Sequence, residues 1–297
     1  MFGIYNILKI PSIHNTFNNF NIVGIYSMLF RLCVVILSNH CHCYFMKVIT
    51  FANHKGGVGK TTSTLTVGQE LARRGQRVLF LDCDPQHNLT MSFAANVTTH
   101  LGTVIRGERT LKQIIVGVGE GMGLAGSARE LTQLEKILGQ QPTYQFFLRD
   151  QLEEVAADYD YVLIDTPPAL TSLTYAALVA SDAVFIPVQP EFYGYEGLTT
   201  LLEACAIMGK NFNPRLKVGG LFLTKYSASY RLSLHHDVVA IMRENAVTGP
   251  LLMNTSIRQN GKLSEAQIEK QNLFAYAPTS NGAEDYRNLT TEILARL

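Results

Sequence analysis

The segment GGVGKTT, at Gly56–Thr62, has the composition of a loop that binds phosphate groups. Its glycines let the backbone turn tightly and direct N–H groups at phosphate oxygens, and a following helix adds partial positive charge. Lys60 would reach the β- and γ-phosphates of a nucleotide, the Thr61 hydroxyl would bind Mg²⁺, and Thr62 would donate to the α-phosphate. The predicted nucleotide-binding residues are Gly56, Gly57, Val58, Gly59, Lys60, Thr61 and Thr62.

The loop departs from the general phosphate-loop pattern at one position. That pattern, G-x-x-x-x-G-K-[ST], requires glycine where this chain has His54. A glycine-rich turn inside a core is therefore the alternative interpretation of this segment taken alone. Other residues of the chain must decide between the two.

Three aspartates follow apolar segments that have the composition of strands. LFLDCD contains Asp82 and ends with Asp84, and YVLID ends with Asp165. Ligands of doubly wound sheets bind at the carboxyl ends of the strands, and a strand that ends in Asp is the metal-side pattern of P-loop NTPases. Each aspartate alone is more often a helix cap or a turn residue. Three of them, together with one phosphate loop, favour a site for a nucleotide and Mg²⁺.

Alternating strands and helices must position these residues. KVITFA (47–52) predicts a buried strand, 61–75 predicts an amphipathic helix, and RVLFLD (77–82) predicts the next strand. This βαβ unit is expected to have a right-handed crossover. Further apolar runs end at Asp165, Val188 and Thr224, as is typical of central strands covered on both faces. We expect one doubly wound α/β domain over 46–297, with a mostly parallel central sheet flanked by helices.

The composition is consistent with a globular protein. The chain has 297 residues, 47% of them apolar, which is enough for one large domain or two small ones. A formal net charge of +1 provides no overall field toward nucleic acid or membranes, so any DNA contact must come from a local patch. Five irregularly placed cysteines favour a reduced, cytoplasmic setting over a disulfide scaffold.

Residues 1–45 differ from the rest of the chain. Lys9 and Arg31 are their only charged side chains. The apolar run NIVGIYSMLFRLCVVILS suggests a signal or an anchor, but Arg31 interrupts it, and a spanning helix needs about 20 apolar residues. A metal site in HCHC lacks a second ligand pair at a suitable spacing. We expect a leader that is disordered or that results from a mis-assigned start, with Met46 as the natural first residue.

Four motifs in order, KGGVGKTT, DCDPQ, DTPP and IPVQPEFYGYEGL, resemble those of the ParA/Soj group of deviant Walker A P-loop ATPases, which partition chromosomes and plasmids. The resemblance implies that Lys55 is the signature lysine, which reaches across a dimer to the partner's nucleotide. Two facing ATP molecules bring about eight negative charges together, which cations must neutralise. It also implies that Asp84 orients the attacking water and that Asp82 and Asp165 serve Mg²⁺ and the switch. Lys55, Lys60 and Asp84 are then the catalytic residues.

The resemblance implies cofactors and partners as well: ATP with Mg²⁺, an ATP-dependent homodimer, non-specific DNA, and a ParB-like protein that stimulates slow hydrolysis. It places the protein in the cytoplasm, on the nucleoid. Lys262 is the best candidate for a DNA contact, followed by Arg258 and Arg231. The chain departs from the family here, with SAS for D-A-R before Arg231 and IRQN for I-P-R-N at Arg258. Scattered basic residues on a solvated face are the ordinary alternative.

A MinD-like membrane-positioning ATPase is the alternative function, since it shares the fold and the loop. Such proteins end in a basic amphipathic helix. The tail EDYRNLTTEILARL contains acidic residues and has an apolar stripe that includes Tyr286, Leu289 and Ile293. We expect this stripe to pack in the core, with no membrane contact. The cysteines lack the setting of a nitrogenase-reductase-like cluster, and the complete set of lysine and aspartates disfavours a non-enzymatic scaffold.

Overall fold

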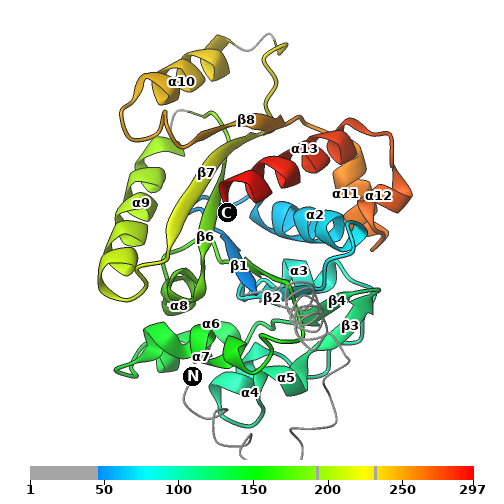
Figure 1. The fold of residues 1–297 in the computed structure, drawn as a ribbon, viewed down its shortest axis with the longest axis vertical. Coiled ribbons are helices and arrows are strands. Elements are labelled where there is room, and N and C mark those ends of the chain that lie inside the picture. Colours follow the sequence, from blue (N-terminus) through cyan, green and yellow to red (C-terminus); the bar gives the residue numbers. More distant parts are fainter. Residues whose placement is uncertain (1–45, 192–193, 231–232) are drawn as a thin grey trace, which may run out of the picture. The chain divides into compact units, whose positions relative to one another are not determined.

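The computed structural model describes residues 46–191, 194–230 and 233–297, and the predicted leader lies outside them. In this part of the chain an eight-stranded sheet has the order β3-β4-β2-β5-β1-β6-β7-β8 (Figure 1). Neighbouring strands are parallel, except for the antiparallel pair β3 and β4. The strands are β1 (Lys47–Phe51), β2 (Val78–Asp82), β3 (Val116–Gly119), β4 (Met122–Ala125), β5 (Tyr161–Asp165), β6 (Ala183–Val188), β7 (Lys217–Thr224) and β8 (Leu252–Ile257).

Helices cover both faces of this sheet. One face packs against α2, α11, α12 and α13, and the other packs against a layer that includes α4 to α10. The helices are α2 (Lys60–Arg73), α3 (Asn88–Met91), α4 (Leu101–Ile105), α5 (Leu111–Ile114), α6 (Leu131–Leu138), α7 (Phe147–Glu153), α8 (Ser172–Ala180), α9 (Gly194–Asn211), α10 (Ser233–Glu244), α11 (Gly261–Ile268), α12 (Leu273–Tyr276) and α13 (Asn281–Arg296).

The central strands are apolar throughout because they supply side chains to both layers. Phe80 of β2 packs on the α2 side, whereas its neighbours Leu79 and Leu81 pack in the opposite layer. Gly68 allows α2 to approach the sheet closely, since a Cβ atom there would lie 2.2 Å from the Phe80 ring. The helix predicted over 61–75 is confirmed as α2, and it is buried from Ser63 to Leu71.

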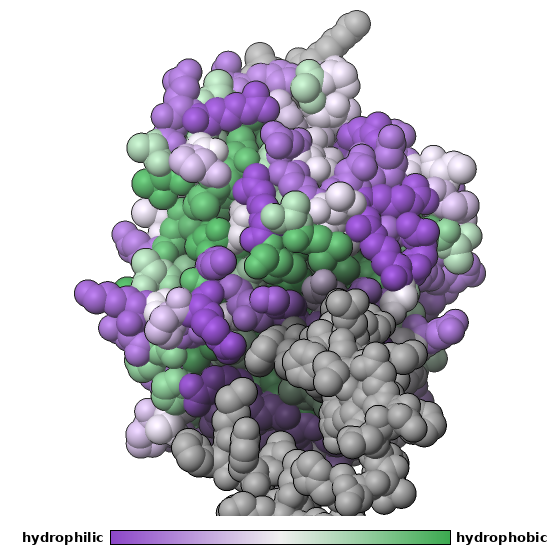
Figure 2. All heavy atoms as spheres, viewed as in Figure 1, coloured by the Kyte–Doolittle hydropathy of each residue, from purple (hydrophilic) through white to green (hydrophobic). Residues whose placement is uncertain are grey.

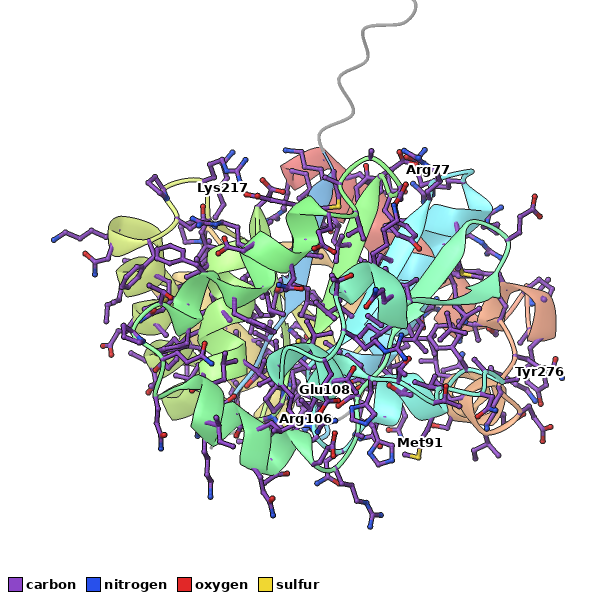
Figure 3. The ribbon with its side chains drawn as sticks, turned by 90° about the horizontal axis from the view of Figure 1, so that it is seen from below. Arg77, Met91, Arg106, Glu108, Lys217 and Tyr276 are labelled. Atoms are coloured by element: carbon purple, nitrogen blue, oxygen red, sulfur yellow. The ribbon has the colours of Figure 1, made fainter. Side chains whose placement is uncertain are left out.

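The parallel strands all begin on one side of the domain, and their carboxyl ends all lie on the opposite side. Figure 3 shows Arg77 and Lys217, at the beginnings of β2 and β7, on one rim of the domain. Met91, at the end of α3, lies on the opposite rim. Since α3 comes soon after the end of β2, the rim near Met91 is the one at which the parallel strands end. The phosphate loop and the predicted aspartates lie on that side of the domain, at the carboxyl ends of the parallel strands.

The sequence-based prediction of the fold class is confirmed, and the strands that end at Asp165, Val188 and Thr224 are β5, β6 and β7. The edge strands β3 and β8, and β4 next to β3, give no comparable signal. β3 and β4 have four residues each and contain glycine, and β8 has a polar centre. Within the described ranges, no helix has the length and apolar character needed to cross a membrane.

Some apolar side chains reach the surface on the face drawn in Figure 2. They lie over α9 and β7, with hydrophilic side chains around them. Ile207 of α9, for example, is 52% exposed. Single exposed apolar residues are normal on globular proteins and do not define a docking site.

Candidate nucleotide site

The predicted phosphate loop connects the end of β1 to the start of α2. Gly57 and Gly59 have φ angles of 73° and 100°, in the left-handed region that glycine adopts without strain. Gly59 is the N-cap of α2, so the helix N-terminus with its free N–H groups opens at the loop. Gln189 donates to the Gly57 carbonyl at 2.9 Å, and Thr224 donates to the Val58 carbonyl at 2.8 Å. These two hydrogen bonds, donated by residues outside the loop, fix the backbone conformation of the loop.

Two cavities open on this loop. The first has a volume of about 260 Å³ and is lined by Gly56, Gly57, Gly59, Lys60, Thr61, Thr62, Asp84, Gln86, Asn88 and Pro168. It brings the predicted nucleotide-binding residues together with Asp84. The second has a volume of about 350 Å³ and shares Gly57, Gly59 and Thr62 with the first. It extends to the end of β7, the loop 257–261 and Tyr286. Adjoining cavities of this size are typical of a small-molecule site.

Lys60 is the buried cation of the site. It is 6% exposed, and its Nζ atom donates to the carbonyl of Lys55 at 3.1 Å. Burial lowers the pKa of Lys60, whereas the charges of Asp165 and Asp84 act in the opposite direction. A charge-assisted bond to an anion is stronger than a bond to a neutral carbonyl. Lys60 can therefore give up its hydrogen bond to the Lys55 carbonyl and bind a phosphate oxygen instead.

Thr61 is joined directly to Asp165. Its hydroxyl donates to Asp165 Oδ2 at 2.7 Å. Asp165 is fully buried, and its Oδ1 atom has no hydrogen-bond partner among the described residues. Burial, and then the charge of Asp82, raise the pKa of Asp165 well above its usual value, so a nearby cation would stabilise the ionised form. Mg²⁺ and its waters bind hard oxygen groups of this kind, so the residues present fit the predicted metal site.

Asp82 and Asp84 have different surroundings after β2. Asp82 Oδ2 accepts hydrogen bonds from the backbone and the hydroxyl of Thr90, at 2.8 and 2.7 Å, and Oδ1 accepts one from the Asp84 N–H at 3.1 Å. Burial raises the pKa of Asp82 to about 6. Its contacts hold the segment that carries Asp84, and its metal role stays a prediction. Asp84 faces the first cavity, where burial raises its pKa and strengthens it as a base.

Lys55, the predicted signature lysine, lies beside the loop and forms an ion pair with Glu191 of its own chain. The two side chains are 35% and 50% exposed. The Lys55 N–H donates to the Asn53 side chain at 2.9 Å. The ammonium group of Lys55 thus contacts the connection between β6 and α9, and Lys55 does not line the first cavity.

Two of the three predicted DNA-binding residues are engaged by carboxylates. Arg258 donates to Asp285 through Nε at 3.0 Å and through Nη2 at 2.6 Å, and also to Glu284 at 2.7 Å. Lys262 pairs with Glu265 at 2.6 Å in an exposed position. Arg231 lies outside the described residues. The role of all three in DNA binding stays a prediction.

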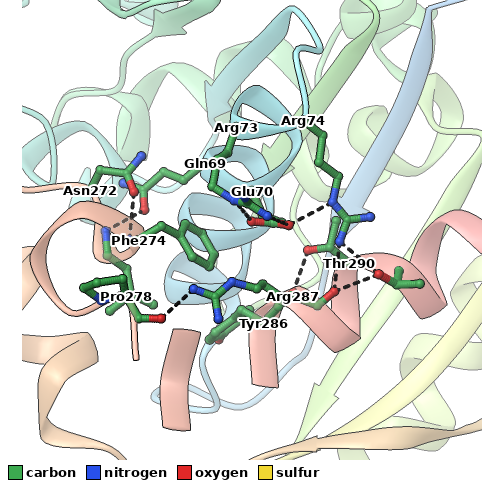
Figure 4. A network of polar contacts seen from close by, with 12 residues as sticks. Gln69, Glu70, Arg73, Arg74, Asn272, Phe274, Pro278, Tyr286, Arg287 and Thr290 are labelled. Atoms are coloured by element: carbon green, nitrogen blue, oxygen red, sulfur yellow. Dashed lines mark hydrogen bonds and ion pairs between the residues drawn. The ribbon is translucent and has the colours of Figure 1, made fainter. Parts of the chain in front are cut away.

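The C-terminal end of α2 is bound to α13 through Arg74, which belongs to a cluster of charged side chains around Glu70 (Figure 4). Glu70 is fully buried and accepts hydrogen bonds from Arg73 at 2.6 and 2.8 Å and from Arg74 at 2.8 Å. Arg74 also donates to the hydroxyl of Thr291 at 2.9 Å and to the carbonyl of Arg287 at 3.1 Å, both on α13. These contacts orient the helix whose N-terminus opens at the phosphate loop.

Sequence reasoning missed the residues of the second cavity that lie outside the phosphate loop. The loop 257–261 contains IRQN, which the family resemblance assigned to DNA contacts, whereas the structure places it at this cavity. One signal was available, because Asn260 has the residue type of an N-cap and does cap α11 by accepting from the Lys262 N–H at 2.9 Å. A capped helix start beside a phosphate loop can be recognised only once the fold brings the two together.

Comparison with known proteins shows which family the chain is similar to. Residues 46–218 match a family described as AAA domain. The chromosome partitioning protein ParA of Caulobacter vibrioides is 37% identical over 257 residues, which cover 84% of this chain and 95% of that protein. The chromosome-partitioning ATPase Soj of Treponema pallidum is 35% identical over 260 residues, covering 84% and 98% of the two chains.

A solved structure shares the fold and carries a nucleotide. It is the cobyrinic acid a,c-diamide synthase of Mycobacterium smegmatis with a bound ATP analogue and magnesium. It is 28% identical to this chain, with a TM-score of 0.72, and the match covers 84% of this chain and 94% of that one.

The doubly wound sheet, the glycine loop at the start of α2 and the strand-end aspartates define a P-loop nucleotide-binding protein. The identity to partitioning proteins over nearly their whole length then decides the family: this chain belongs to the ParA/Soj family of partitioning ATPases. The resemblance inferred from the four sequence motifs is confirmed.

Proposed function

We propose that this chain is a ParA-like DNA-partitioning ATPase that binds ATP with Mg²⁺, dimerises on ATP, binds DNA non-specifically and is reset by hydrolysis. One observation carries the proposal: Lys60, Thr61 and Asp84 line a single cavity, and Thr61 is bonded to a buried Asp165 that has an unpartnered oxygen. The positive charge, the metal-binding oxygens and the base that phosphoryl transfer requires are thereby collected at one helix N-terminus.

Each residue of the first cavity has a distinct task in this proposal. The loop N–H groups and Lys60 bind and orient the phosphates, and Lys60 neutralises charge that develops on the transferred group. Thr61 and Asp165 would hold Mg²⁺, which supplies further charge neutralisation when bound. Asp84, a carboxylate made more basic by burial, orients the attacking water and accepts its proton. Asp82 keeps Asp84 in place through the Asp84 N–H.

The second cavity is suited to the nucleoside. It shares Thr62 with the phosphate site and is closed by the loop 257–261 on one side and by Tyr286 on another. The loop is fixed by Asp285, which accepts hydrogen bonds from both the backbone and the side chain of Arg258. The Tyr286 hydroxyl is bonded to Ser63 of α2 at 3.0 Å. A nucleoside therefore meets a preformed wall, which favours tight binding.

The position of Lys55 beside the loop supports the proposed ATP-dependent dimer. In the proposed dimer its ammonium reaches the phosphates of the partner's ATP, so that nucleotide becomes part of the interface. DNA binding would then come from a local cluster of cations on the dimer, since the net charge of the chain is only +1. We further propose that a ParB-like protein stimulates hydrolysis and that the ATPase acts in the cytoplasm, on the nucleoid.

The MinD-like alternative receives no support from the C-terminal helix. Tyr286 is 1% exposed, and Leu289 and Ile293 are 0% exposed, so the prediction that this stripe packs in the core is confirmed. The ParA and Soj relatives described above are partitioning proteins. The proposal therefore keeps DNA as the surface on which the ATPase acts.

Sedimentation and DNA binding test this proposal together. The chain should be monomeric without nucleotide and with ADP, and dimeric with ATP and Mg²⁺. Duplex DNA of unrelated sequences should be bound only in the ATP state, with an affinity that falls steeply with salt. The variant Lys55→Ala should lose ATP-dependent dimerisation and keep most of its nucleotide affinity as a monomer. ATP-dependent sedimentation with anionic liposomes, without DNA binding, would instead support the membrane alternative.

A further inference from the structure

The end of β6 and the connection that follows it are bound at three points to residues 53–57, at the start of the phosphate loop. Asn53 donates to the carbonyl of Pro187, in β6, at 2.7 Å, and Gln189 of the connection donates to the carbonyl of Gly57 at 2.9 Å. The third point is the ion pair between Lys55 and Glu191. The first two bonds involve uncharged groups and fix the backbone of both segments. They leave the ion pair as the contact that can open without unfolding either segment.

Lys55 is also linked to Lys60 through its backbone. The Lys55 carbonyl accepts the hydrogen bond from Lys60 Nζ at 3.1 Å. A bound triphosphate draws Lys60 away from this carbonyl, because a charge-assisted bond to phosphate is the stronger one. Phosphate binding in a subunit's own loop thus frees the carbonyl of Lys55, the residue whose side chain Glu191 holds, while the Lys55 N–H stays bonded to Asn53.

Two further basic residues lie near Glu191. The hydrogen bond from Lys55 lowers the pKa of Glu191 against the effect of burial, and Lys225 and His235 act in the same direction as Lys55. Lys225 directly follows β7, and His235 belongs to α10. Glu191 therefore keeps the positive charge of Lys225 nearby when Lys55 leaves, which limits the cost of opening the pair.

We propose that Glu191 is a positioning residue that holds Lys55 within its own subunit until ATP is bound, and thereby sets the protein concentration at which the dimer forms. The inference rests on the proposed function, in which Lys55 acts on the partner's nucleotide. In this proposal Lys55 leaves Glu191 to reach the partner's phosphates, so each subunit opens its pair on dimerisation. A triphosphate carries more charge than one carboxylate and competes for the lysine better than a diphosphate does.

The expected effect is moderate because the pair is partly exposed. Ion pairs at protein surfaces change an equilibrium by about 1.4- to 5-fold each. Two pairs open when two subunits associate, so removing Glu191 should tighten the ATP-bound dimer by about 2- to 30-fold. Raising the salt concentration should reduce this difference, since salt screens the pair.

The variant Glu191→Gln tests the inference. Its dimer dissociation constant, measured by sedimentation with a non-hydrolysable ATP analogue and Mg²⁺, should be about 2- to 30-fold lower than that of the wild type. Its monomer affinity for the analogue should be unchanged, because Glu191 lines neither cavity. Glu191→Asp keeps the negative charge, so its dimer should be weaker than that of Glu191→Gln and close to that of the wild type. Glu203→Gln, the same change at an exposed position of α9, is the matched control and should behave as wild type.

The double variant Lys55→Ala/Glu191→Gln separates the pair from a general loosening of the loop. It should dimerise no better than Lys55→Ala alone, because Glu191 acts through Lys55. If Glu191→Gln tightened the dimer equally in the wild type and in the Lys55→Ala variant, the inference would be overturned. A wild type that dimerises with ATP and a Glu191→Gln variant with the same dissociation constant would also overturn it, and would leave the proposed function intact. A wild type that stays monomeric in ATP would refute the proposed function itself.

Cross-linking of the unaltered protein gives a second test that does not depend on a variant folding. A zero-length carbodiimide should join Lys55 to Glu191 in the nucleotide-free monomer, and mass spectrometry of the digest should detect the linked peptides. The yield should fall several-fold with ATP and Mg²⁺ at protein concentrations that give a dimer. A yield that does not depend on nucleotide would contradict the release of Lys55.

Discussion

Thr61, the second residue of α2, donates its hydroxyl to Asp165, the last residue of β5, at 2.7 Å. The bond ties the helix of the phosphate loop to a central strand that lies 104 residues further along the chain. It occupies only Oδ2 of the carboxylate, and Oδ1 is buried without a hydrogen-bond partner in the described part of the chain. A buried oxygen in this state is stabilised when a cation or its water is supplied.

The first prediction concerns Mg²⁺. Asp165→Asn keeps the size of the side chain and an acceptor for Thr61, but removes the negative charge. Loss of a residue that holds a metal or its water typically lowers metal affinity by about 10- to 100-fold. We expect a loss of this size in Mg²⁺-dependent ATP affinity, measured by titration with and without Mg²⁺. The variant's affinity for ATP in excess chelator should match that of the wild type.

The same variant gives a stability readout. Burial, followed by repulsion from Asp82, raises the pKa of Asp165 well above its usual value, so the ionised carboxylate is unfavourable without a cation. Asp165→Asn should therefore keep or increase the melting temperature of the nucleotide-free protein. An equal loss of ATP affinity with and without Mg²⁺, together with a lower melting temperature, would show that Asp165 only supports the loop.

The second prediction concerns hydrolysis. Asp84→Ala removes the base of the first cavity and leaves the phosphate-binding groups in place. General base catalysis contributes about 10²- to 10⁴-fold, so the ATPase rate should fall by this factor while ATP affinity changes little. The ATP-bound dimer should accumulate on DNA and dissociate slowly, as measured by a filter or surface assay. Asn88→Ala, at another residue lining the cavity, is the control for cavity shape. Normal turnover in Asp84→Ala would remove this residue from the mechanism.

The parts of the site that are local in sequence could be predicted from the sequence. The phosphate loop lies between one strand and one helix, and each aspartate lies at or next to the end of its own apolar run, so short-range patterns sufficed for Lys60, Thr61, Asp84 and Asp165. The family resemblance added the role of Lys55. None of these inferences required knowledge of how distant segments pack.

The remaining parts depend on tertiary packing. Gln189 reaches Gly57 across 132 residues, and Tyr286 reaches Ser63 across 223 residues. No local pattern marks such partners, because glutamine and tyrosine have many ordinary roles. Glu191 likewise stands within a recognised motif, yet its contact with Lys55 becomes visible only when β1 and β6 lie side by side.

The third prediction concerns the charge cluster around Glu70. Glu70→Gln leaves the guanidinium groups of Arg73 and Arg74 without their carboxylate. The cost is below that of a fully buried pair, since these side chains are 51% and 29% exposed, and we expect about 1–3 kcal/mol of lost stability at pH 7. Urea unfolding measures this change. Glu203→Gln is the control, with an expected change within about 0.5 kcal/mol.

The pH dependence of this effect has a defined sign. Burial alone would raise the pKa of Glu70, but the hydrogen bonds from Arg73 and Arg74 outweigh it and lower the pKa below its ordinary value of 4.5. The stability that Glu70 contributes is thus present above pH 4.5 and is lost as the pH falls through the lowered folded-state pKa. The difference between wild type and Glu70→Gln should narrow on acidification below that value. A difference that stays constant down to pH 3 would contradict the ion cluster.

The fourth prediction separates two basic residues in the DNA hypothesis. Lys262 is exposed, pairs with the exposed Glu265 and lies over the Tyr276 ring at 5.9 Å, and surface contacts of this kind contribute little, so Lys262→Ala should leave stability nearly unchanged. If Lys262 contacts phosphate, the variant should weaken DNA binding in the ATP state similarly for all sequences. The slope of log affinity against log salt should then decrease by about 1. Arg258→Ala should instead destabilise the protein by about 1–3 kcal/mol, because Asp285, which is 6% exposed, loses the guanidinium and keeps only the bond from the backbone N–H of residue 258. Any loss of DNA binding in Arg258→Ala has to be compared at equal folded fraction, and Glu265→Gln serves as the control that frees Lys262. If Lys262→Ala leaves the salt slope unchanged while Arg258→Ala lowers it without loss of stability, the roles assigned to the two residues are reversed.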